Sequence, residues 1–265
     1  MPIAVVTGAG SGLGLHIALK LAQNDYMVYG TAFNQEEIDT LYQRSAGKVL
    51  LKLCDITQQS DIDAFANFVQ TQPTHQLDVL INNAGILTPG PIEILPLDAI
   101  FKEFDVNTFG LLRIVNAFLP LLRESKGRII QISTVSVDQP SPFNAPSSAS
   151  KAAAEIFTDM YGAELKKFGI STSIAVCGNM QTGGPAKVQK ALDRMISDMS
   201  PAQDAIYGPE FRDFTDRIMQ GQHHGLDADR AAQEIIDLVK DTNSPLRVAI
   251  GDDARRILAQ ASSVS

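Results

Sequence analysis

The segment Thr7–Gly14 has the composition of a loop that binds a diphosphate. It follows an apolar run, Ile3–Val6, and precedes a segment of helical periodicity. Glycines allow a tight turn and a close approach of the backbone to phosphate oxygens, and the N-terminus of the following helix attracts negative charge. A glycine-rich turn without a ligand is the alternative, but the strand and helix on either side favour nucleotide binding. The predicted phosphate-binding residues are Gly8, Ser11, Gly12, Leu13 and Gly14.

The residues after the second apolar run bear on the choice between NAD and NADP. At that position an acidic side chain binds the ribose hydroxyls of NAD, whereas a basic one favours the phosphate of NADP. The chain has Ala32, Phe33 and Asn34 there, and we place Phe33 among the cofactor-binding residues. The missing carboxylate at Ala32 favours NADP slightly, but no Lys or Arg replaces it nearby. The predicted cofactor is therefore NAD(P), with a slight preference for NADP.

Seven short apolar runs alternate with segments of helical periodicity, which is the pattern of a parallel sheet covered on both faces. The runs are 3–6, 26–31, 49–53, 78–82, 128–133, 171–176 and 246–251, and helical stretches lie at 15–22 and near 36–44, 60–70, 98–123, 148–167 and 227–240. Right-handed crossovers then give one doubly wound, Rossmann-type α/β domain over residues 1–265, with a seven-stranded parallel sheet. An irregular stretch from about 183 to 225 departs from the alternation, and we expect it to cover the substrate.

Composition excludes several classes of protein. Of the 265 residues 45% are apolar and 20% are charged, which rules out a disordered or fibrous chain. The net charge of −8 argues against a nucleic-acid or anionic-membrane surface. Two cysteines cannot form a disulfide framework, and four histidines do not cluster at zinc spacing, so no metal site is expected. The most apolar stretch, Phe109–Leu122, contains Arg113 and is shorter than the ~20 residues that a bilayer needs. We expect a cytoplasmic protein without an export signal or membrane partner.

Four further motifs, together with the glycine-rich loop, resemble the short-chain dehydrogenase/reductase family. Thr7–Gly14 matches the family pattern TGxxxGxG, and Asn82–Gly85 matches its NNAG motif. Asn107 stands where the family has its catalytic asparagine. The resemblance covers nearly the whole chain and implies an NAD(P)-dependent dehydrogenase or reductase. The cofactor-binding residues that it adds are Asp55, Ile56, Asn82, Ala84, Gly85, Lys151, Gly178 and Thr182.

The resemblance also implies a catalytic serine, tyrosine and lysine after the fifth strand, and this chain departs from that pattern. In the family the tyrosine passes a proton to or from the substrate oxygen, the serine holds that oxygen, and the lysine lowers the phenol pKa and binds the ribose. Lys151 is present, but Ser147 stands four residues before it in place of tyrosine. Thr134 occupies the serine position, and Cys177 replaces the proline that usually precedes Gly178. The predicted catalytic residues are Asn107, Thr134, Ser147 and Lys151.

Ser147 is a severe departure, because its oxygen falls roughly 5 Å short of the reach of a phenol oxygen. A serine hydroxyl also ionises far less readily than a phenol with a pKa of ~10. Three hypotheses follow. The chain is an oxidoreductase impaired at one position, or a protein redirected to non-redox chemistry, or a nucleotide-sensing binding protein. The intact surroundings of Lys151 favour the first, because a buried lysine without a role is costly.

The sequence says less about the substrate and the protein partner than about the fold and the cofactor. Part of the apolar set in the segment 183–225 is expected to form a pair of helices that pack on the sheet. Its numerous methionines favour a medium-sized apolar alcohol, ketone or aldehyde as substrate. Ser200–Phe211 has a short, weak similarity to the retinol and hydroxysteroid dehydrogenase branch. Tyr207 is interpreted as an anchor of the covering segment, and His223 and His224 as part of a solvated loop. Helices 98–123 and 148–167 are apolar on more than one face, and with the family resemblance this favours a homodimer or homotetramer.

Overall fold

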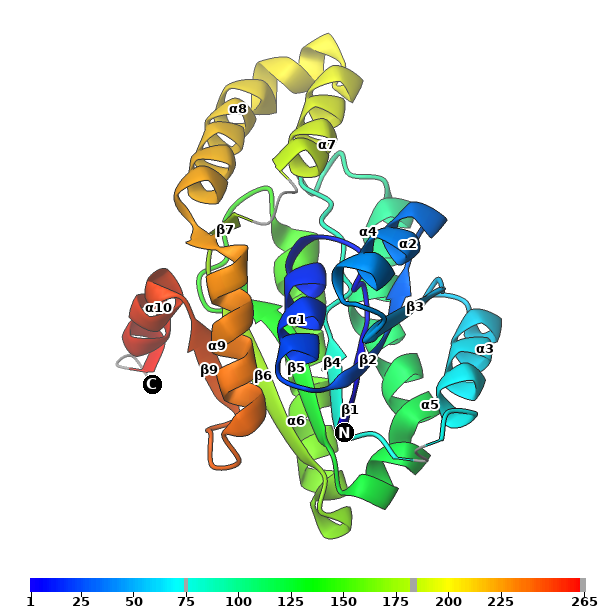
Figure 1. The fold of residues 1–265 in the computed structure, drawn as a ribbon. Helices are drawn as coiled ribbons and strands as arrows, with labels where there is room; N and C mark the ends of the chain where they lie inside the picture. Colours follow the sequence, from blue (N-terminus) through cyan, green and yellow to red (C-terminus); the bar gives the residue numbers. More distant parts are fainter. Residues whose placement is uncertain (74–75, 182–184, 263–265) are drawn as a thin grey trace.

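The structure is a computed structural model that describes residues 1–73, 76–181 and 185–262. Its centre is a sheet of seven parallel strands in the order β3-β2-β1-β4-β5-β6-β9 (Figure 1). The strands are β1 (Ile3–Val6), β2 (Met27–Ala32), β3 (Val49–Leu53), β4 (Val79–Asn82), β5 (Arg128–Thr134), β6 (Ser171–Cys177) and β9 (Arg247–Ile250). The order reverses between β1 and β4, as in a doubly wound fold. The predicted fold class is confirmed.

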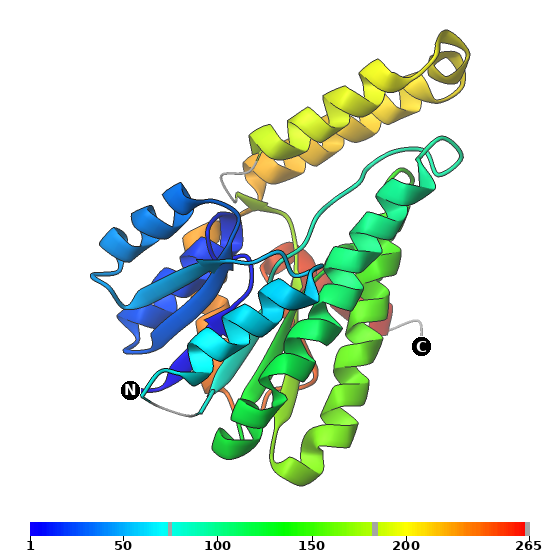
Figure 2. The ribbon, with the colours of Figure 1, turned by 90° about the vertical axis from the view of Figure 1, so that its right-hand side faces the viewer.

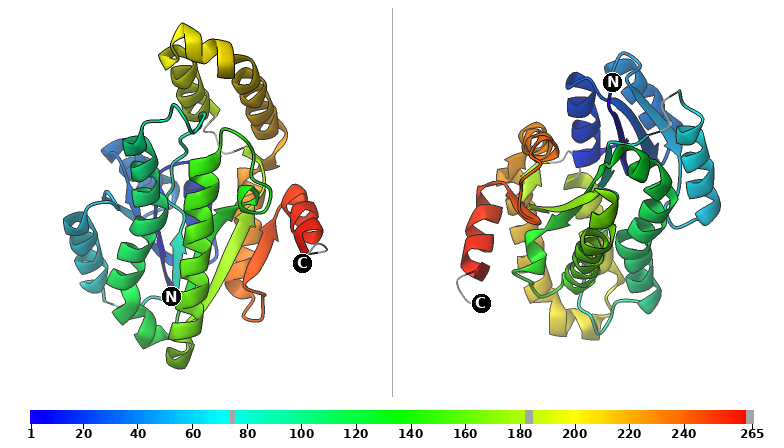
Figure 3. Two further views of the ribbon diagram at one scale, coloured as in Figure 1. Left: turned by 180° about the vertical axis from the view of Figure 1, so that it is seen from behind. Right: turned by 90° about the horizontal axis from the view of Figure 1, so that it is seen from below.

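Two layers of helices cover the sheet, one on each face (Figures 1 and 3). One layer holds α1 (Gly12–Gln23), α2 (Gln35–Arg44) and α9 (Ala228–Lys240), and the other holds α3 (Gln59–Gln70), α5 (Gly110–Ser125) and α6 (Ala145–Leu165). Side chains of β1 alternate between the two apolar cores: Val6 packs with the first layer and Val5 with the second. Both are fully buried, which explains the uninterrupted apolar run in the sequence.

The predicted helix 98–123 is not continuous. It consists of α4 (Leu97–Phe104), a π-helical turn at Asp105–Phe109, and α5. Such turns are rare in helices and frequent at functional sites, and this one contains Asn107. Within the described residues, Leu97–Ser125 is long and apolar enough to cross a membrane by length and composition alone, but 50% of its apolar window is buried in the fold. This stretch packs as a core helix, with Phe118 fully buried.

The prediction of an irregular segment at 183–225 is wrong for its described part. Residues from 185 onward form a helical hairpin of α7 (Pro185–Asp198) and α8 (Pro201–His224), which extends away from the sheet (Figure 2). Ser200 caps α8 in a capping box with Gln203, a local signal that the sequence reading missed. The hairpin has its own apolar cluster around Leu192, Phe211 and Phe214, separate from the two cores of the sheet.

The hairpin is joined to the sheet at one end. The short strands β7 (Met180–Gln181) and β8 (Leu226–Asp227) pair in parallel at its base. Phe143, in the loop before α6, packs edge-on against Phe211 and Phe214, with ring centroids 5.4 and 5.7 Å away. Its φ of +67° is unusual for a bulky residue. After β9 the chain ends in α10 (Asp252–Ser262), which lies beyond the edge of the sheet and was not predicted.

Candidate active site

The glycine-rich loop leaves little room for side chains at its glycine positions. Gly8 has a φ of +64°, and its N–H donates to the Thr31 hydroxyl at 2.8 Å. Asn83 stabilises the start of the same loop, because its Nδ2 donates to the carbonyl of Thr7 at 3.0 Å. A Cβ atom on Gly14 would lie 2.2 Å from the carbonyl oxygen of Gly8, so only glycine fits there. The loop is thus held in a conformation that Gly8 and Gly14 make possible.

The N-terminus of α1 has the features of an anion site. Ser11 is its N-cap residue, with an extended backbone and no capping hydrogen bond from its side chain among the described residues. The first turn of α1 carries no acidic side chain to neutralise the helix dipole. The N–H groups of Gly12 and Leu13 have no intrahelical partner at this position in a helix. The residues present therefore fit a diphosphate.

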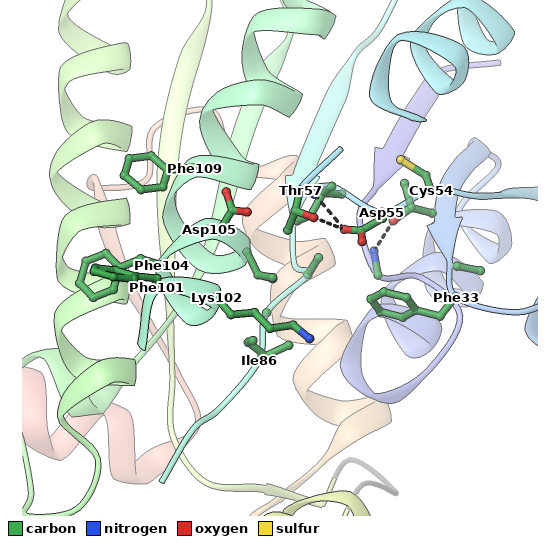
Figure 4. A pocket seen from close by; sticks show the side chains of 17 residues that line it. Phe33, Cys54, Asp55, Thr57, Ile86, Phe101, Lys102, Phe104, Asp105 and Phe109 are labelled. Carbon is green, nitrogen blue, oxygen red and sulfur yellow. Dashed lines mark hydrogen bonds between the residues drawn. The ribbon is translucent and has the colours of Figure 1, made fainter. Parts of the chain in front are cut away.

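A cavity of about 600 Å³ lies beside this loop, at the carboxyl ends of β1 to β4 (Figure 4). Six predicted cofactor-binding residues line it, which are Gly8, Phe33, Asp55, Ile56, Ala84 and Gly85. The sequence reading missed the opposite wall, built from α4 and the π-helical turn and including Phe101, Lys102, Phe104, Asp105 and Phe109. The phenylalanines of this stretch were assigned to packing on the sheet and, on a second face, to ordinary burial or a dimer interface. The size and lining of the cavity suit the adenosine half of a dinucleotide.

Two other predicted cofactor-binding residues, Asn82 and Gly178, lie elsewhere. Asn82 does not line the cavity: its side chain is buried beside Gln131 and lines a smaller void with it. The neighbouring Asn83 is the side chain that braces the loop. Gly178 follows β6, where a Cβ atom would lie 1.9 Å from the Asp253 carboxylate. Thr182 falls outside the described residues.

Lys151 and Asn107 converge beside Gly85. The Lys151 ammonium donates to the carbonyl of Ile132 at 2.9 Å. Asn107 Oδ1 accepts from the N–H of Ile86 at 2.9 Å, and its Nδ2 donates to the Ser150 hydroxyl at 3.0 Å. A Cβ atom on Gly85 would lie 3.1 Å from Asn107 Oδ1 and 3.4 Å from Lys151 Nζ. Two residues far apart in the sequence thus meet at the edge of the cofactor cavity.

The position expected of a tyrosine holds a small, buried hydroxyl. Ser147 lies in the first turn of α6 and is 9% exposed. Thr134 ends β5, and its hydroxyl oxygen accepts from the N–H of Ser136 at 3.3 Å. Lys151 bonds to Ile132, two residues before Thr134 on the same strand, so the lysine and threonine share one end of β5.

Tyr207, Tyr161, His223 and His224 do not take the place of the missing phenol. The Tyr207 hydroxyl donates to the Glu93 carboxylate, which links α8 to the loop before α4. This contact agrees with the predicted anchoring role. Tyr161 donates to Asn116 on α5 at 2.9 Å. His223 and His224 are exposed at the end of α8, so they are solvated as expected but helical, not in a loop.

An ion-pair network supports the catalytic strand and helix from behind. Arg247 on β9 forms a bidentate pair with Asp138, at 2.8 and 2.6 Å. Its Nε lies 2.8 Å from Glu155 on α6, and Glu155 accepts from the Ser133 hydroxyl at 2.5 Å. Ser133 precedes Thr134, and Glu155 is one helical turn after Lys151. Arg247 therefore ties together the two elements that carry the catalytic residues.

Burial shifts the pKa values of several ionisable groups in this region. It lowers the pKa of Lys151, an effect that Cys177, Glu103 and Glu155 partly oppose. Burial also raises the pKa of the Cys177 thiol to about 12, which agrees with an inert packing role. Glu103 is fully buried on α4, and its pKa is raised mainly by that burial. Its Oε1 accepts from Asn107 Nδ2 at 3.3 Å, while its Oε2 has no hydrogen-bond partner within the described part of the chain.

The buried Glu103 makes stability depend on pH. Because its pKa in the folded state is above 4.5, stability from the neutral acid is present below about pH 4.5 and is lost as pH rises through the folded-state pKa. In Glu103→Gln we expect the free energy of unfolding to exceed that of the wild type by about 1 kcal/mol near pH 8, because the buried charge is gone. Denaturant unfolding near pH 8 and about pH 5 should show the difference shrinking at the lower pH. The exposed Glu124→Gln is the control, and an equal difference at both pH values for Glu103→Gln would contradict the assignment.

Comparison with known proteins identifies the family. A family model for short chain dehydrogenases matches residues 2–193. The chain belongs to the short-chain dehydrogenase family. An uncharacterised oxidoreductase of Bacillus subtilis (strain 168), YusZ, is 30% identical over 243 residues, which are 89% of this chain and 82% of that protein. By type the chain is therefore an NAD(P)-dependent dehydrogenase or reductase.

Solved structures of the short-chain dehydrogenase family share the whole architecture. A short-chain dehydrogenase from Streptomyces avermitilis is similar with a TM-score of 0.81 and 27% identity, covering 99% of this chain and 92% of that one. A variant of the actinorhodin polyketide ketoreductase, solved with NADPH, has a TM-score of 0.76 and 26% identity, covering 94% of this chain and 96% of that one.

Proposed function

We propose that the protein interconverts an alcohol and a ketone or aldehyde with NAD(P), at a rate limited by Ser147. The observation that carries the proposal is the convergence of Lys151 and Asn107 on Gly85, at the edge of a cavity beside the glycine-rich loop. Lys151 is half-buried and Asn107 is 2% exposed, and desolvating a lysine ammonium is costly unless its charge is used. Their retention favours an oxidoreductase over a binding protein.

The roles of the residues follow from the family and from their positions. The N-terminus of α1 would hold the diphosphate, and Lys151 the ribose next to the nicotinamide, which supplies or accepts the hydride when bound. Thr134 can hold the substrate oxygen, because its hydroxyl both donates and accepts. A general acid must reach the substrate oxygen and must have a suitable pKa. The Ser147 side chain is too short for the first, and its hydroxyl is too weakly acidic for the second. Proton transfer then depends on solvent, which is slower than transfer from a positioned group.

The apolar residues of the α7–α8 hairpin favour the proposal that the substrate is apolar and of medium size. Its inner cluster includes the partly buried Met195, Met199 and Met219, and flexible thioethers adapt to varied apolar shapes. Met195 also reaches the body of the protein, since its sulfur would lie 2.8 Å from a Cβ atom on Gly90. Gly90 lies in the loop after the NNAG motif, so this contact brings the hairpin over the catalytic end of the sheet.

Binding of the cofactor is the direct test of the proposal. We expect isothermal titration calorimetry of the purified protein to show binding of at least one of NAD⁺ and NADP⁺, with a dissociation constant on the order of micromolar to millimolar. The reduced forms are the parallel titrations. No heat of binding from any of the four nucleotides would overturn the proposed function and leave only the fold.

A redirected, non-redox activity is the second candidate, and Ser147 is the observation that favours it. A serine in place of the general acid slows ordinary carbonyl reduction while leaving a nucleotide site intact, so the site can serve another reaction. This candidate predicts product formation with the cofactor unchanged, which absorbance of the nicotinamide would show.

We also propose a homo-oligomer. Exposed apolar side chains gather on α4, the π-helical turn and α6, which lie against one another in the structure. They include Phe101, Phe109, Ile156, Phe157 and Met160. A gathering of exposed apolar side chains on adjoining elements is typical of a surface that another protein chain covers. A monomeric mass by light scattering at micromolar concentration would contradict this proposal.

A further inference from the structure

We propose that Glu37 makes the site selective for NAD over NADP, by placing a carboxylate where the extra phosphate of NADP would have to lie. The inference rests on the proposed function, because it concerns the same cofactor. It replaces the slight preference for NADP that Ala32 suggested, since the carboxylate missing from the end of β2 is supplied by α2.

The carboxylate of Glu37 touches both segments that surround the adenosine ribose in a doubly wound fold. Its Oε2 accepts from the N–H of Phe33, directly after β2, at 3.1 Å. The same oxygen lies 2.1 Å from the position of a Cβ atom on Gly10 in the glycine-rich loop. The Glu37 carboxylate therefore occupies the space beside Gly10 that a side chain there would take. The acid closes the gap between the loop and the second strand.

The charges around this point favour a hydroxyl over a phosphate. The segments Thr7–Gly14 and Thr31–Gln35 contain no lysine or arginine. A carboxylate can accept hydrogen bonds from both ribose hydroxyls of NAD. The phosphate of NADP adds roughly −1.5 to −2 charges and would meet the Glu37 carboxylate with no cation supplied by either segment.

Lys102 is the residue that would favour NADP instead of NAD. It lines the cavity from the opposite wall, and Figure 4 shows its amine extending toward the side where Phe33 lies. In the described part of the chain its amine has no ion pair. A lysine that reached the extra phosphate would favour NADP, so its contribution has to be measured beside that of Glu37.

A purely structural role for Glu37 makes a different prediction. Glu37 is the third residue of α2, and its N–H donates to the capping Asn34 side chain at 2.8 Å. Its bond to Phe33 could therefore serve only to fix the start of the helix. That role needs an acceptor oxygen but no charge, so the neutral glutamine would preserve both the helix and the ratio of NAD to NADP affinity.

The experiment compares dissociation constants of NAD⁺ and NADP⁺ by calorimetry, independently of turnover. We expect the wild type to bind NAD⁺ at least about tenfold more tightly, and Glu37→Gln to lower this ratio by about tenfold through loss of the repulsion. Glu37→Lys should bind NADP⁺ more tightly than NAD⁺. The matched control is Glu36→Gln, which removes an equal charge from the exposed neighbouring position and should leave the ratio nearly unchanged.

Each other outcome decides against the inference. Equal or tighter binding of NADP⁺ by the wild type overturns it, as does an unchanged ratio in Glu37→Gln that still unfolds cooperatively at the wild-type temperature. A loss of NADP⁺ affinity alone in Lys102→Met would assign the phosphate to Lys102 instead. Absence of binding by either nucleotide would be the failure of the proposed function, which is distinct from a failure of selectivity.

Discussion

Ser147→Tyr is expected to raise the rate of nicotinamide-dependent turnover by about 10²- to 10⁴-fold, the usual contribution of a positioned general acid or base. The phenol would lie four residues before Lys151, one turn away on α6, and would extend beyond the buried serine toward the substrate side. The measurement is nicotinamide absorbance with a panel of apolar ketones and alcohols. Lys151, Asn107 and the Thr134 hydroxyl are already present, so one substitution supplies the missing phenol.

Ser147→Phe is the matched control, because it adds the same ring without the hydroxyl. It should remain near the wild-type rate if proton transfer is what the tyrosine restores. A similar gain from both variants would mean that the ring only improves substrate packing. Tight nucleotide binding by Ser147→Tyr with no turnover of any substrate would favour redirected chemistry or a binding protein.

Arg247→Met is expected to cost about 3 kcal/mol in the free energy of unfolding, because it leaves two buried carboxylates without their cation. The side chains of Asp138 and Glu155 are only 10% and 8% exposed, so neither is well solvated when Arg247 is lost. Denaturant unfolding near pH 7 measures the change. Because Glu155 also bonds to Ser133, a loss of nucleotide affinity should accompany the loss of stability.

The control for this prediction is Arg255→Met. Arg255 pairs with Glu234 at 3.0 Å, but its side chain is 48% exposed, so removal should cost about 1 kcal/mol or less. Equal effects of the two substitutions would show that the network behind β5 and α6 is no more important than a surface ion pair.

The fold could be predicted from the sequence because its signals are local. Buried strands read as short apolar runs, such as Ile3–Val6, and the observed bounds of the seven strands agree with the predicted ones to within a residue. The glycine-rich loop was recognisable because Gly8 and Gly14 are required by backbone geometry at fixed spacing. The departure at Ser147 was equally plain, since it depends only on its distance from Lys151 along the chain.

The remainder of the site depends on contacts between distant segments. The turn at Asp105–Phe109 was not predicted, because nothing in its apolar spacing distinguishes a π-helical turn from an α-helix. A pair of helices was expected here only as packing on the sheet, because Gly208, Pro209 and Gly221 interrupt the helical pattern. The hairpin instead packs against Phe143 and its own cluster, which the sequence does not show. Glu37 was overlooked because it comes five residues after Ala32 and reaches the glycine loop only once α2 has folded back.

Some expectations stay predictions. The cytoplasmic location and the lack of a nucleic-acid partner rest on charge and composition alone. The identity of the substrate rests on the apolar character of the hairpin.

The separate apolar cluster of the hairpin has an evolutionary consequence. Leu192, Phe211 and Phe214 pack with one another, with Phe143 and with neighbouring hairpin residues, and not with either face of the sheet. Mutations in α7 and α8 can therefore accumulate without loosening the nucleotide-binding half of the molecule. The arrangement is modular: new specificities can be acquired by diversifying the hairpin while the machinery beneath it is inherited unchanged.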